Sequence, residues 1–555
     1  MLLKTGSLVG LLGLLWIGPE TLAASDISLG SPVPDKILNK VSPNKISIAS
    51  LSNQWQELDK TDNGSLQGFL LQSAFPDPDW WLQFKDPHLR HYIEQALQQN
   101  PDLRIANLRI SQAKAAMAQV RAIQFPSLDI QGRYTRQRVG GAAVGSNALP
   151  GGGALTGGSL VNSATPSVSS TPNSSYNLYT VPLVATYEVD VWGKNRLKVK
   201  SARIAIEQQT QLARATALNL STQVAAAYFN LLRTDAQIAT AQALLANAKQ
   251  TMAIQQGLFT SGIIPYDGLL LTAEDLAAYQ QTLVQANGQQ GLYAHQLMFL
   301  TGAPPVTQEH IERADLQALV FPSDIPTGIP SELIVRRPDI VASELLLKQS
   351  AINVSEARRE FLPTINLVGS FGFASRELAN LFDWKSHAAS LTSVLNQSLF
   401  AGGAHFANLK LQKSLAAQQI QAYQSTLLKA FQQVEDSIVT LKADYGGYQQ
   451  NLVAIRFADK AVALNQSRFN MGISPKLAVL MAQRQQLQFQ QLANQNKASS
   501  LVDLVNLYSA LGEVTPHDVV CPTGADSALY LYCPGALYFA DGHCDHLQHV
   551  DRYLS

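Results

Sequence analysis

The chain has 555 residues, enough for three or four ordinary domains, so its length alone selects no architecture. Its 41 basic residues balance its 41 acidic ones, and 15% of all residues are charged whereas 46% are hydrophobic. Nucleic acid is excluded as a partner, because no basic excess is present to hold phosphates.

The N-terminus has the order of a secretory signal. Lys4 precedes an apolar stretch from Leu8 to Ile17, and a small-residue site at Ala23 follows. This stretch is too short to span a bilayer, so residues 1–23 are predicted to be a signal peptide and residues 24–75 an N-terminal periplasmic tail. A buried N-terminal helix is the alternative. No cysteine follows the apolar stretch, so we expect no lipid anchor there, and no later apolar run predicts a transmembrane helix.

Two parts of the chain repeat each other. Residues 100–132 match residues 337–369 at an offset of 237, and residues 193–302 match residues 403–512 at an offset of 210. Because each offset holds over many positions, the pattern indicates a tandem duplication. The matched pairs are Pro101 and Pro338, Arg121 and Arg358, Gly132 and Gly369, Gly193 and Gly403, Phe259 and Phe469, Gly262 and Gly472, Pro265 and Pro475, and Gly302 and Gly512.

The duplication predicts a domain organisation. It consists of a first repeat over residues 76–303, an inter-repeat linker over 304–336, a second repeat over 337–514 and a C-terminal extension over 515–555.

The first repeat contains an insertion. The two offsets differ by 27 residues, and Val139–Ser175 consists mostly of Gly, Ala, Ser, Thr, Asn and Pro. This composition cannot bury enough surface to fold, so a flexible loop is predicted at 139–175. A phosphate-binding loop is excluded, because no Gly-Lys-Ser/Thr follows.

Strands are predicted on both sides of the insertion. Apolar and polar residues alternate from Leu128 to Thr135 and from Tyr179 to Val191, which is typical of strands with one apolar face. Tyr179–Tyr187 has about the length of a membrane-crossing strand. The second half repeats the pattern less cleanly at Ile365–Phe373 and Leu391–Phe400. For one hairpin alone, a soluble sandwich would be the simpler interpretation.

Very long helices follow each pair of strands. Residues 194–256 contain neither glycine nor proline, and a similar run at 404–470 is interrupted only by Gly446-Gly447. At 1.5 Å per residue the first run would extend about 90 Å. An apolar stripe recurs every three or four residues, at Ala217, Leu220, Val224, Ala227 and Leu231. A simple coiled coil is the alternative, but each run is joined directly to a strand and each occurs twice.

Four strands in one chain cannot close a barrel, and lipid does not tolerate open sheet edges. Oligomerisation is therefore required, and three copies would supply twelve strands.

At this point the sequence resembles the outer membrane factors, the TolC-like channels, and within them the NodT-type multidrug-efflux subgroup. The resemblance covers about residues 75–514. It departs from the subgroup in the missing lipidation cysteine and in the C-terminal extension. The motifs that carry it are Trp80-Trp81 with Phe84, Asp86 and Leu89; Ala96-Leu97 and Asn100; Val189 to Lys194; Leu300-Thr301-Gly302; Ile329 to Leu333 running into Arg336 to Ile340; Ala357-Arg358; Phe361-Leu362-Pro363; Leu399 to Gly403; and Leu507 to Gly512.

The resemblance implies an α+β membrane protein. It would be a homotrimer with a twelve-stranded β-barrel in the outer membrane, in contact with lipid, continued by a long α-helical barrel in the periplasm. It also implies docking to a periplasmic adaptor protein and an inner-membrane transporter, with drugs or other small compounds flowing passively outward. The rivals are the duct of a type I protein-secretion system and a periplasmic helical scaffold. No cofactor is expected, and no nucleophile elbow, zinc-protease motif or dinucleotide loop indicates an enzyme.

Two glycine-proline turns separate long helices, at Gly262–Asp267 and Gly472–Lys476. Such helix hairpins point away from the strands, so we expect them to form the periplasmic tip. In the resembled family, charged and polar residues at these tips constrict the pore. By this resemblance Tyr266, Asp267 and Lys476 are the candidate gate residues, although solvated charges or adaptor contacts explain them equally well.

Three cysteines lie in the C-terminal extension. An exported chain favours a disulfide, most simply between Cys521 and Cys533, which leaves Cys544 unpaired. A zinc or copper site is the second interpretation and an unstructured tail the third. The group comprises Cys521, Cys533, Cys544, His543, His546 and His549.

Overall fold

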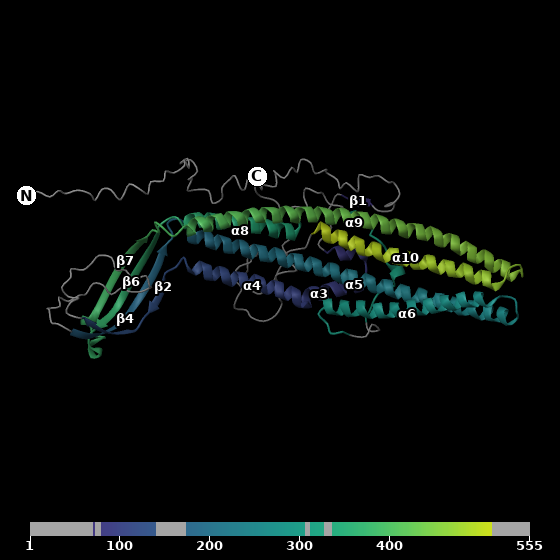
Figure 1. Ribbon diagram of the computed structural model, residues 1–555, viewed down its shortest axis with the longest axis horizontal. Helices are drawn as coiled ribbons and strands as arrows, with labels where there is room; N and C mark the ends of the chain where they lie inside the picture. Colours follow the sequence, from purple (N-terminus) through teal and green to yellow (C-terminus); the bar gives the residue numbers. More distant parts are fainter. Residues whose placement is uncertain are drawn as a thin grey trace, which may run out of the picture. The chain divides into compact units, whose positions relative to one another are not determined.

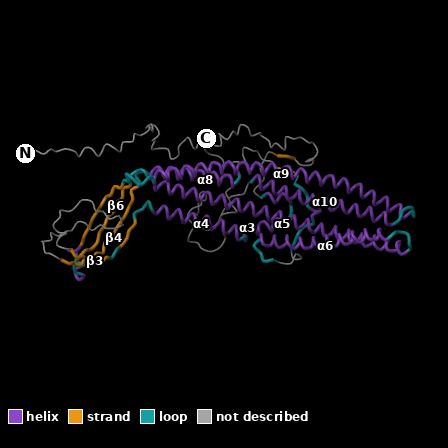
Figure 2. Tube along the Cα trace, in the orientation of Figure 1, coloured by secondary structure: helices purple, strands orange, loops and turns teal. Residues whose placement is uncertain are grey.

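The computed structural model describes residues 70–72, 79–139, 174–305, 311–322, 324–326 and 336–512. The predicted signal peptide and the C-terminal extension, with its candidate disulfide and metal ligands, lie outside the described residues, as does most of the predicted loop. Within the described part, Figures 1 and 2 show the strands at one end of the long helices and the turns between helices at the other.

Long helices dominate both halves of the chain. At 1.5 Å per residue, each 67-residue helix extends about 100 Å. The first and last residues of α4 and α8 differ by the sequence offset of 237, and those of α5 and α9 by the offset of 210. The helices are α3 (Pro87–Gln99), α4 (Pro101–Ala122), α5 (Lys194–Thr260), α6 (Tyr266–Leu300), α8 (Pro338–Arg359), α9 (Ala404–Asn470) and α10 (Lys476–Leu511).

Both predicted long helices are confirmed, and the second includes Gly446-Gly447, where its glycine-free run is interrupted. Helix α9 runs through both glycines without a break. A Cβ atom on Gly447 would collide with the side-chain amide of Asn496 on α10, so this glycine permits close packing between the two helices. Helix α5 likewise continues through Gly257 to Thr260, beyond the predicted end at residue 256. No helix that the structure describes is both long enough and apolar enough to cross a bilayer.

The strands form one antiparallel sheet. The order is β2–β4–β6–β7, with β3 also paired to β4, so β2 and β3 lie along the same edge of β4. A separate parallel pair joins β1 to β5. The strands are β1 (Leu70–Gln72), β2 (Ser127–Ile130), β3 (Arg133–Val139), β4 (Ser174–Val189), β5 (Asp324–Pro326), β6 (Thr364–Ser375) and β7 (His387–Asn396).

Several predicted strand limits need correction. Val139 pairs with Ser174 and Arg138 with Ser175, so the sheet extends into both ends of the segment predicted as loop. Strand β4 ends at Val189 and not at Val191. Strand β7 ends at Asn396 and not at Phe400, because the following residues form the glycine turn into α9.

A proline in the middle of the sheet explains the interruption between β2 and β3. Pro182 lies in the central strand β4 and has no backbone N–H to donate, which is rarely tolerated there. On one side it faces Gly372 of β6. On the other side its carbonyl accepts a hydrogen bond from the Gln131 N–H at 3.1 Å, at the point where pairing shifts from β2 to β3.

The helices lie side by side in one layer. Near the sheet the order is α4, α5, α8, α9, and toward the hairpin turns it is α6, α5, α10, α9. Helix α9 is therefore one edge over its whole length, while α4 and α6 share the other. The predicted stripe from Ala217 to Leu231 is buried. It belongs to a core that also includes residues of α3, η3 (Trp80–Phe84) and η6 (Leu316–Ala318), and the linker residues Ile311, Leu319 and Ile325.

Candidate functional site

The sheet has one apolar and one polar face, as the alternation predicts. Register places Leu128, Ala185, Gly369 and Leu391 in one row, and Ile130, Leu183, Phe371 and Ala389 in the next. The side chains of Leu128, Ile130 and Leu391 are 65–81% exposed, so no described part of the chain covers them. The opposite face carries polar side chains, for example Ser370 and Ser390, whose hydroxyl oxygens lie 2.8 Å apart. Such a sheet suits a boundary between lipid and water.

The strand-to-helix junction of the first half is fixed by the motif Val189 to Lys194. The Asp190 carboxylate accepts hydrogen bonds from the backbone N–H groups of Asn195 and Arg196, at 3.1 and 2.9 Å. Both N–H groups belong to the first turn of α5 and have no acceptor within the helix, so the Asp190 carboxylate caps the N-terminus of α5. Gly193 has a φ of +72°, which favours glycine.

The same junction also ties the two halves together. The Trp192 indole N–H donates to the Pro363 carbonyl at 2.7 Å, and the Arg359 guanidinium donates to the Gly193 carbonyl at 2.6 Å. Both bonds join the first half to the motif that leads into β6. The family-type motifs here therefore fix the angle at which strands become helices.

The Trp80-Trp81 motif has a structural role in the middle of the helical layer. The Trp80 ring lies 5.6 Å from that of Tyr508 on α10, and the Phe84 ring lies 5.2 Å from that of Phe229 on α5. Asp86, the next motif residue, caps α3 by accepting from the His88 and Leu89 N–H groups.

Tyr228 links this motif to the inter-repeat linker. Its hydroxyl donates to the Asp86 carboxylate at 2.6 Å and accepts from the Ala314 N–H at 3.1 Å. Tyr228 is fully buried, and burial raises the pKa of its phenol well above the usual range, with the Asp86 bond acting in the same direction. The hydroxyl therefore stays protonated and keeps both bonds. Nothing in the sequence pattern singled out Tyr228.

Residues at matching positions of the two halves bond to the helix ends in a similar way. The Asn100 amide donates to the Leu300 carbonyl at 2.8 Å, and the Arg337 guanidinium donates to the Ala510 carbonyl at 2.9 Å. Leu300 and Ala510 are themselves related by the offset of 210. Each half thus joins the last turn of its final helix to the start of a shorter helix.

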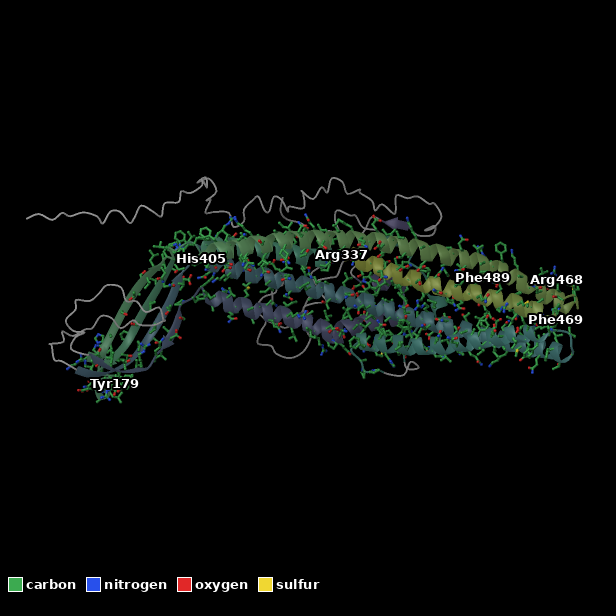
Figure 3. The ribbon with its side chains drawn as sticks, in the orientation of Figure 1. Tyr179, Arg337, His405, Arg468, Phe469 and Phe489 are labelled. Carbon is green, nitrogen blue, oxygen red and sulfur yellow. The ribbon has the colours of Figure 1, made fainter. Side chains whose placement is uncertain are left out.

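The three predicted gate residues lie at the starts of α6 and α10, at the hairpin tips. The Tyr266 ring packs 5.6 Å from the Phe259 ring. The Lys476 Nζ lies 5.4 Å from the centre of the ring of Phe469, a residue that Figure 3 labels at the hairpin end of the helices. Asp267 is exposed and its carboxylate accepts from the Gly268 N–H. Within the part of the protomer that the structure describes, no ion pair joins Asp267 to Lys476.

The structure instead joins the two hairpins further along. The Arg484 guanidinium on α10 donates to the Asp275 carboxylate on α6 at 2.7 Å. The Asn247 amide on α5 donates to the Leu480 carbonyl on α10 at 3.0 Å, and Asn247 is buried. Sequence reasoning missed these residues, because an ion pair between helices nearly 210 residues apart leaves no local pattern.

No cluster of metal-binding side chains is present among the described residues. The cysteines and histidines of the C-terminal extension fall outside that part of the chain, so their disulfide and metal interpretations remain predictions.

An amphipathic sheet that continues into helices of about 100 Å defines a class of protein, the outer-membrane channels with a periplasmic helical extension. A family model described as outer membrane efflux protein matches residues 92–303 and 329–513. The chain belongs to this family and is an outer-membrane efflux channel, with its helices extending into the periplasm.

Individual relatives agree with this assignment. The chain is 27% identical over 446 residues to the "Probable efflux pump outer membrane protein TtgC" of Pseudomonas putida, covering 79% of this chain and 86% of that protein. It is 26% identical over 450 residues to the "Cation efflux system protein CusC" of Escherichia coli, covering 79% and 88%. The crystal structure of the Campylobacter jejuni CmeC outer membrane channel has the same fold, with a TM-score of 0.68 at 23% identity over 79% of this chain and 88% of that one.

Proposed function

We propose that three copies of this chain form a closed duct, with a twelve-stranded β-barrel above a twelve-helix barrel, built on an internal duplication. The unpaired sheet edges carry the proposal. Among the described strands of the protomer, β7 pairs only with β6, and β2 and β3 pair only with β4. Strand edges are not left open in lipid, so β7 of one copy pairs with β2 and β3 of the next.

The helix edges support the same assembly. Exposed apolar side chains line α9 on one edge and α4 with α6 on the other, and burying them between copies is favourable. On α9 they are Phe406, Leu411, Leu428, Phe457 and Leu464; on the other edge they are Ile105, Leu108, Leu271, Val284, Leu292 and Phe299. Four helices lie side by side at each level of one protomer, so three protomers give twelve.

The duct is proposed to act as the passive exit of a tripartite efflux pump, without enzymatic activity of its own. A periplasmic adaptor would bind the duct, and an inner-membrane transporter would supply the energy for export. Drugs or other small compounds are the proposed cargo. Related proteins are named for different cargoes, from solvents to cations, so they leave the exported compound open. A type I protein-secretion duct is the alternative function.

At the periplasmic tip we propose a gate, formed by Tyr266, Asp267 and Lys476 with the Asp275–Arg484 pair. Asp267 and Lys476 lie at the starts of α6 and α10, the second helices of the two hairpins, and we infer that they pair between adjacent copies. Neutralising either one should loosen closure, and exchanging the two charges should partly restore it. Unchanged single-channel conductance in all three variants would remove Asp267 and Lys476 from the gate.

Two measurements test the assembly. Native mass spectrometry of the detergent-purified chain should give a trimer, and planar bilayers should show channels with discrete conductance. A cysteine pair placed on β7 and β2 should cross-link between copies, whereas the same residues cannot meet within one protomer because β4 and β6 separate the two strands. A stable monomer in membranes would contradict the proposal.

A further inference from the structure

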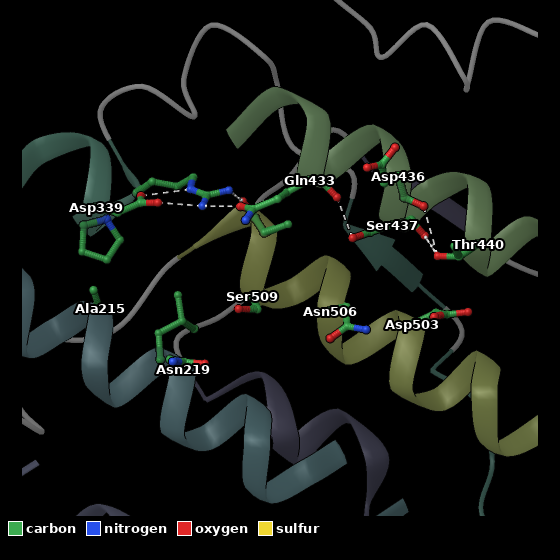
Figure 4. A pocket seen from close by; sticks show the side chains of 14 residues that line it. Ala215, Asn219, Asp339, Gln433, Asp436, Ser437, Thr440, Asp503, Asn506 and Ser509 are labelled. Carbon is green, nitrogen blue, oxygen red and sulfur yellow. Dashed lines mark hydrogen bonds and ion pairs between the residues drawn. The ribbon is translucent and has the colours of Figure 1, made fainter. Parts of the chain in front are cut away.

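A polar pocket lies in the helical layer, far from the hairpin tips. It has a volume of about 650 Å³ and lies between α5, α8, α9 and α10 (Figure 4). Sites for small molecules have volumes of about 300–1,000 Å³, so the pocket is large enough for one. The polar side chains that line it include Asn219, Gln433, Asp436, Asp503, Asn506 and Ser509.

The pocket carries an excess of negative charge. The Arg337 guanidinium donates hydrogen bonds to the Asp339 carboxylate at 3.1 and 2.8 Å, and to the Gln433 amide oxygen at 2.7 Å. No basic side chain in the described part of the chain pairs with Asp436 or Asp503. One Asp503 carboxylate oxygen is buried and has no hydrogen-bond partner there. Such an oxygen remains available to a donor that enters the pocket.

The pocket opens on the face of the layer opposite the linker. Three residues contact the linker from three helices: Tyr228 bonds to Ala314, Tyr445 packs on Phe321, and Lys497 bonds to the Gln317 carbonyl. The pocket residues Asn219, Asp436 and Asn506 are each nine residues from one of them, in α5, α9 and α10 respectively. Nine residues are about two and a half helical turns, which places each pocket residue on the opposite side of its helix.

In the proposed trimer this opposite face lines the channel. Twelve helices at a spacing of about 10 Å enclose a bore of about 30 Å, and three copies of α3 and the linker would fill it. The linker must therefore lie outside, which turns the pocket inward.

We propose that this pocket is a binding site for protonated organic amines that pass along the duct. Asp436 and Asp503 supply the charge, and the carboxamide and hydroxyl oxygens around them accept the remaining N–H donors. Three equivalent sites face the channel at one level. This inference rests on the proposed function for the direction in which the pocket opens, but not for the binding itself.

Spermidine, a polyvalent organic amine, is a suitable probe. Isothermal titration calorimetry of the full-length protein in detergent at pH 8, where the Asp503 carboxyl is mostly ionised, should show binding. The double variant Asp436→Asn/Asp503→Asn should weaken it at least tenfold. The control Glu94→Gln/Glu312→Gln removes the same charge from α3 and the linker, and it should bind like the unmodified protein. Native mass spectrometry of each variant confirms that the assembly is intact.

Conductance separates this inference from the proposed function. Spermidine should reduce the current through single channels, and the pocket variant should need at least a tenfold higher concentration for the same reduction. Equal binding by the pocket variant and the control, with normal channels, would overturn the pocket and leave the duct standing. Absent channels would overturn the duct, while calorimetry would still decide the pocket.

Discussion

At the scale of single residues, the buried hydroxyl of Tyr228 has the clearest energetic role. Tyr228→Phe removes the donor to the Asp86 Oδ2 and the acceptor for the Ala314 N–H, and leaves this oxygen and this N–H without these partners. An unsatisfied buried polar group costs about 1–3 kcal/mol, so the variant should unfold at a lower temperature. Tyr279→Phe is the control, because the Tyr279 hydroxyl makes no hydrogen bond that the described part of the structure records. Equal melting temperatures for the two variants would refute the role of Tyr228.

The Asp503 carboxyl predicts a pH dependence. Burial raises its pKa to about 7, and the nearby Asp444 carboxyl acts in the same direction. The folded state therefore holds this proton more tightly than the unfolded state, whose carboxyl titrates near 4. The contribution of this carboxyl to the free energy of unfolding is therefore largest below pH 4, and it is lost as the pH rises to about 7.

Asp503→Asn tests this dependence. The variant should melt higher than the unmodified protein at pH 8, and the difference should shrink on acidification toward pH 4. The other charged groups of the region are Asp444, Asp436, Asp339 and Arg337, which the variant leaves in place. A difference that is constant with pH would contradict the raised pKa.

At the scale of elements, Gly372 is required by the proline opposite it. A Cβ atom on Gly372 would collide with the Pro182 backbone, whereas a Cβ atom on Gly369 would meet only Leu391 Cδ1 at 3.8 Å. Gly372→Ala should therefore shift β6 away from β4 and cost on the order of 1–3 kcal/mol, as overpacking does. Gly369→Ala should be nearly neutral. The heat-resistant folded fraction on semi-native gels measures both, and similar losses would contradict this account of the sheet.

Local sequence patterns predicted the helices and strands well where a single pattern of residue types continued without interruption. Period two identified the strands, and the absence of glycine and proline identified α5. Predictions fell short where a contact distant in sequence decides the outcome. The close packing of Gly447 against Asn496 on α10, for example, leaves no local pattern in the sequence. Pairing of Val139 with Ser174 likewise extends a hairpin into residues whose composition indicates a loop.

The residues of the candidate site likewise fall into those that a local pattern reveals and those that only packing brings together. Asp267 and Lys476 stand out in the sequence because they follow glycine-proline turns, and they do lie at the tips. Asp275 and Arg484 lie within regular helices, so only the packing of α6 and α10 around α5 brings them together.

At the scale of the whole molecule, the Asp275–Arg484 pair predicts how firmly the duct is closed. It joins the two hairpins of one protomer, and its side chains are nearly half exposed, so each pair contributes at most about 1 kcal/mol. Three pairs in a trimer would then shift the balance between closed and open states by at most about 3 kcal/mol, or about a hundredfold.

Asp275→Asn should raise the open probability of single channels in planar bilayers, and more so at low salt, because salt screens the pair. Glu274→Gln removes the same charge one residue away, where no described basic group pairs with it, and should leave gating unchanged. Exchanging the charges, Asp275→Arg with Arg484→Asp, should restore closure in part. Equal gating in Asp275→Asn and Glu274→Gln would show that the hairpins are held by packing and by the Asn247–Leu480 bond instead.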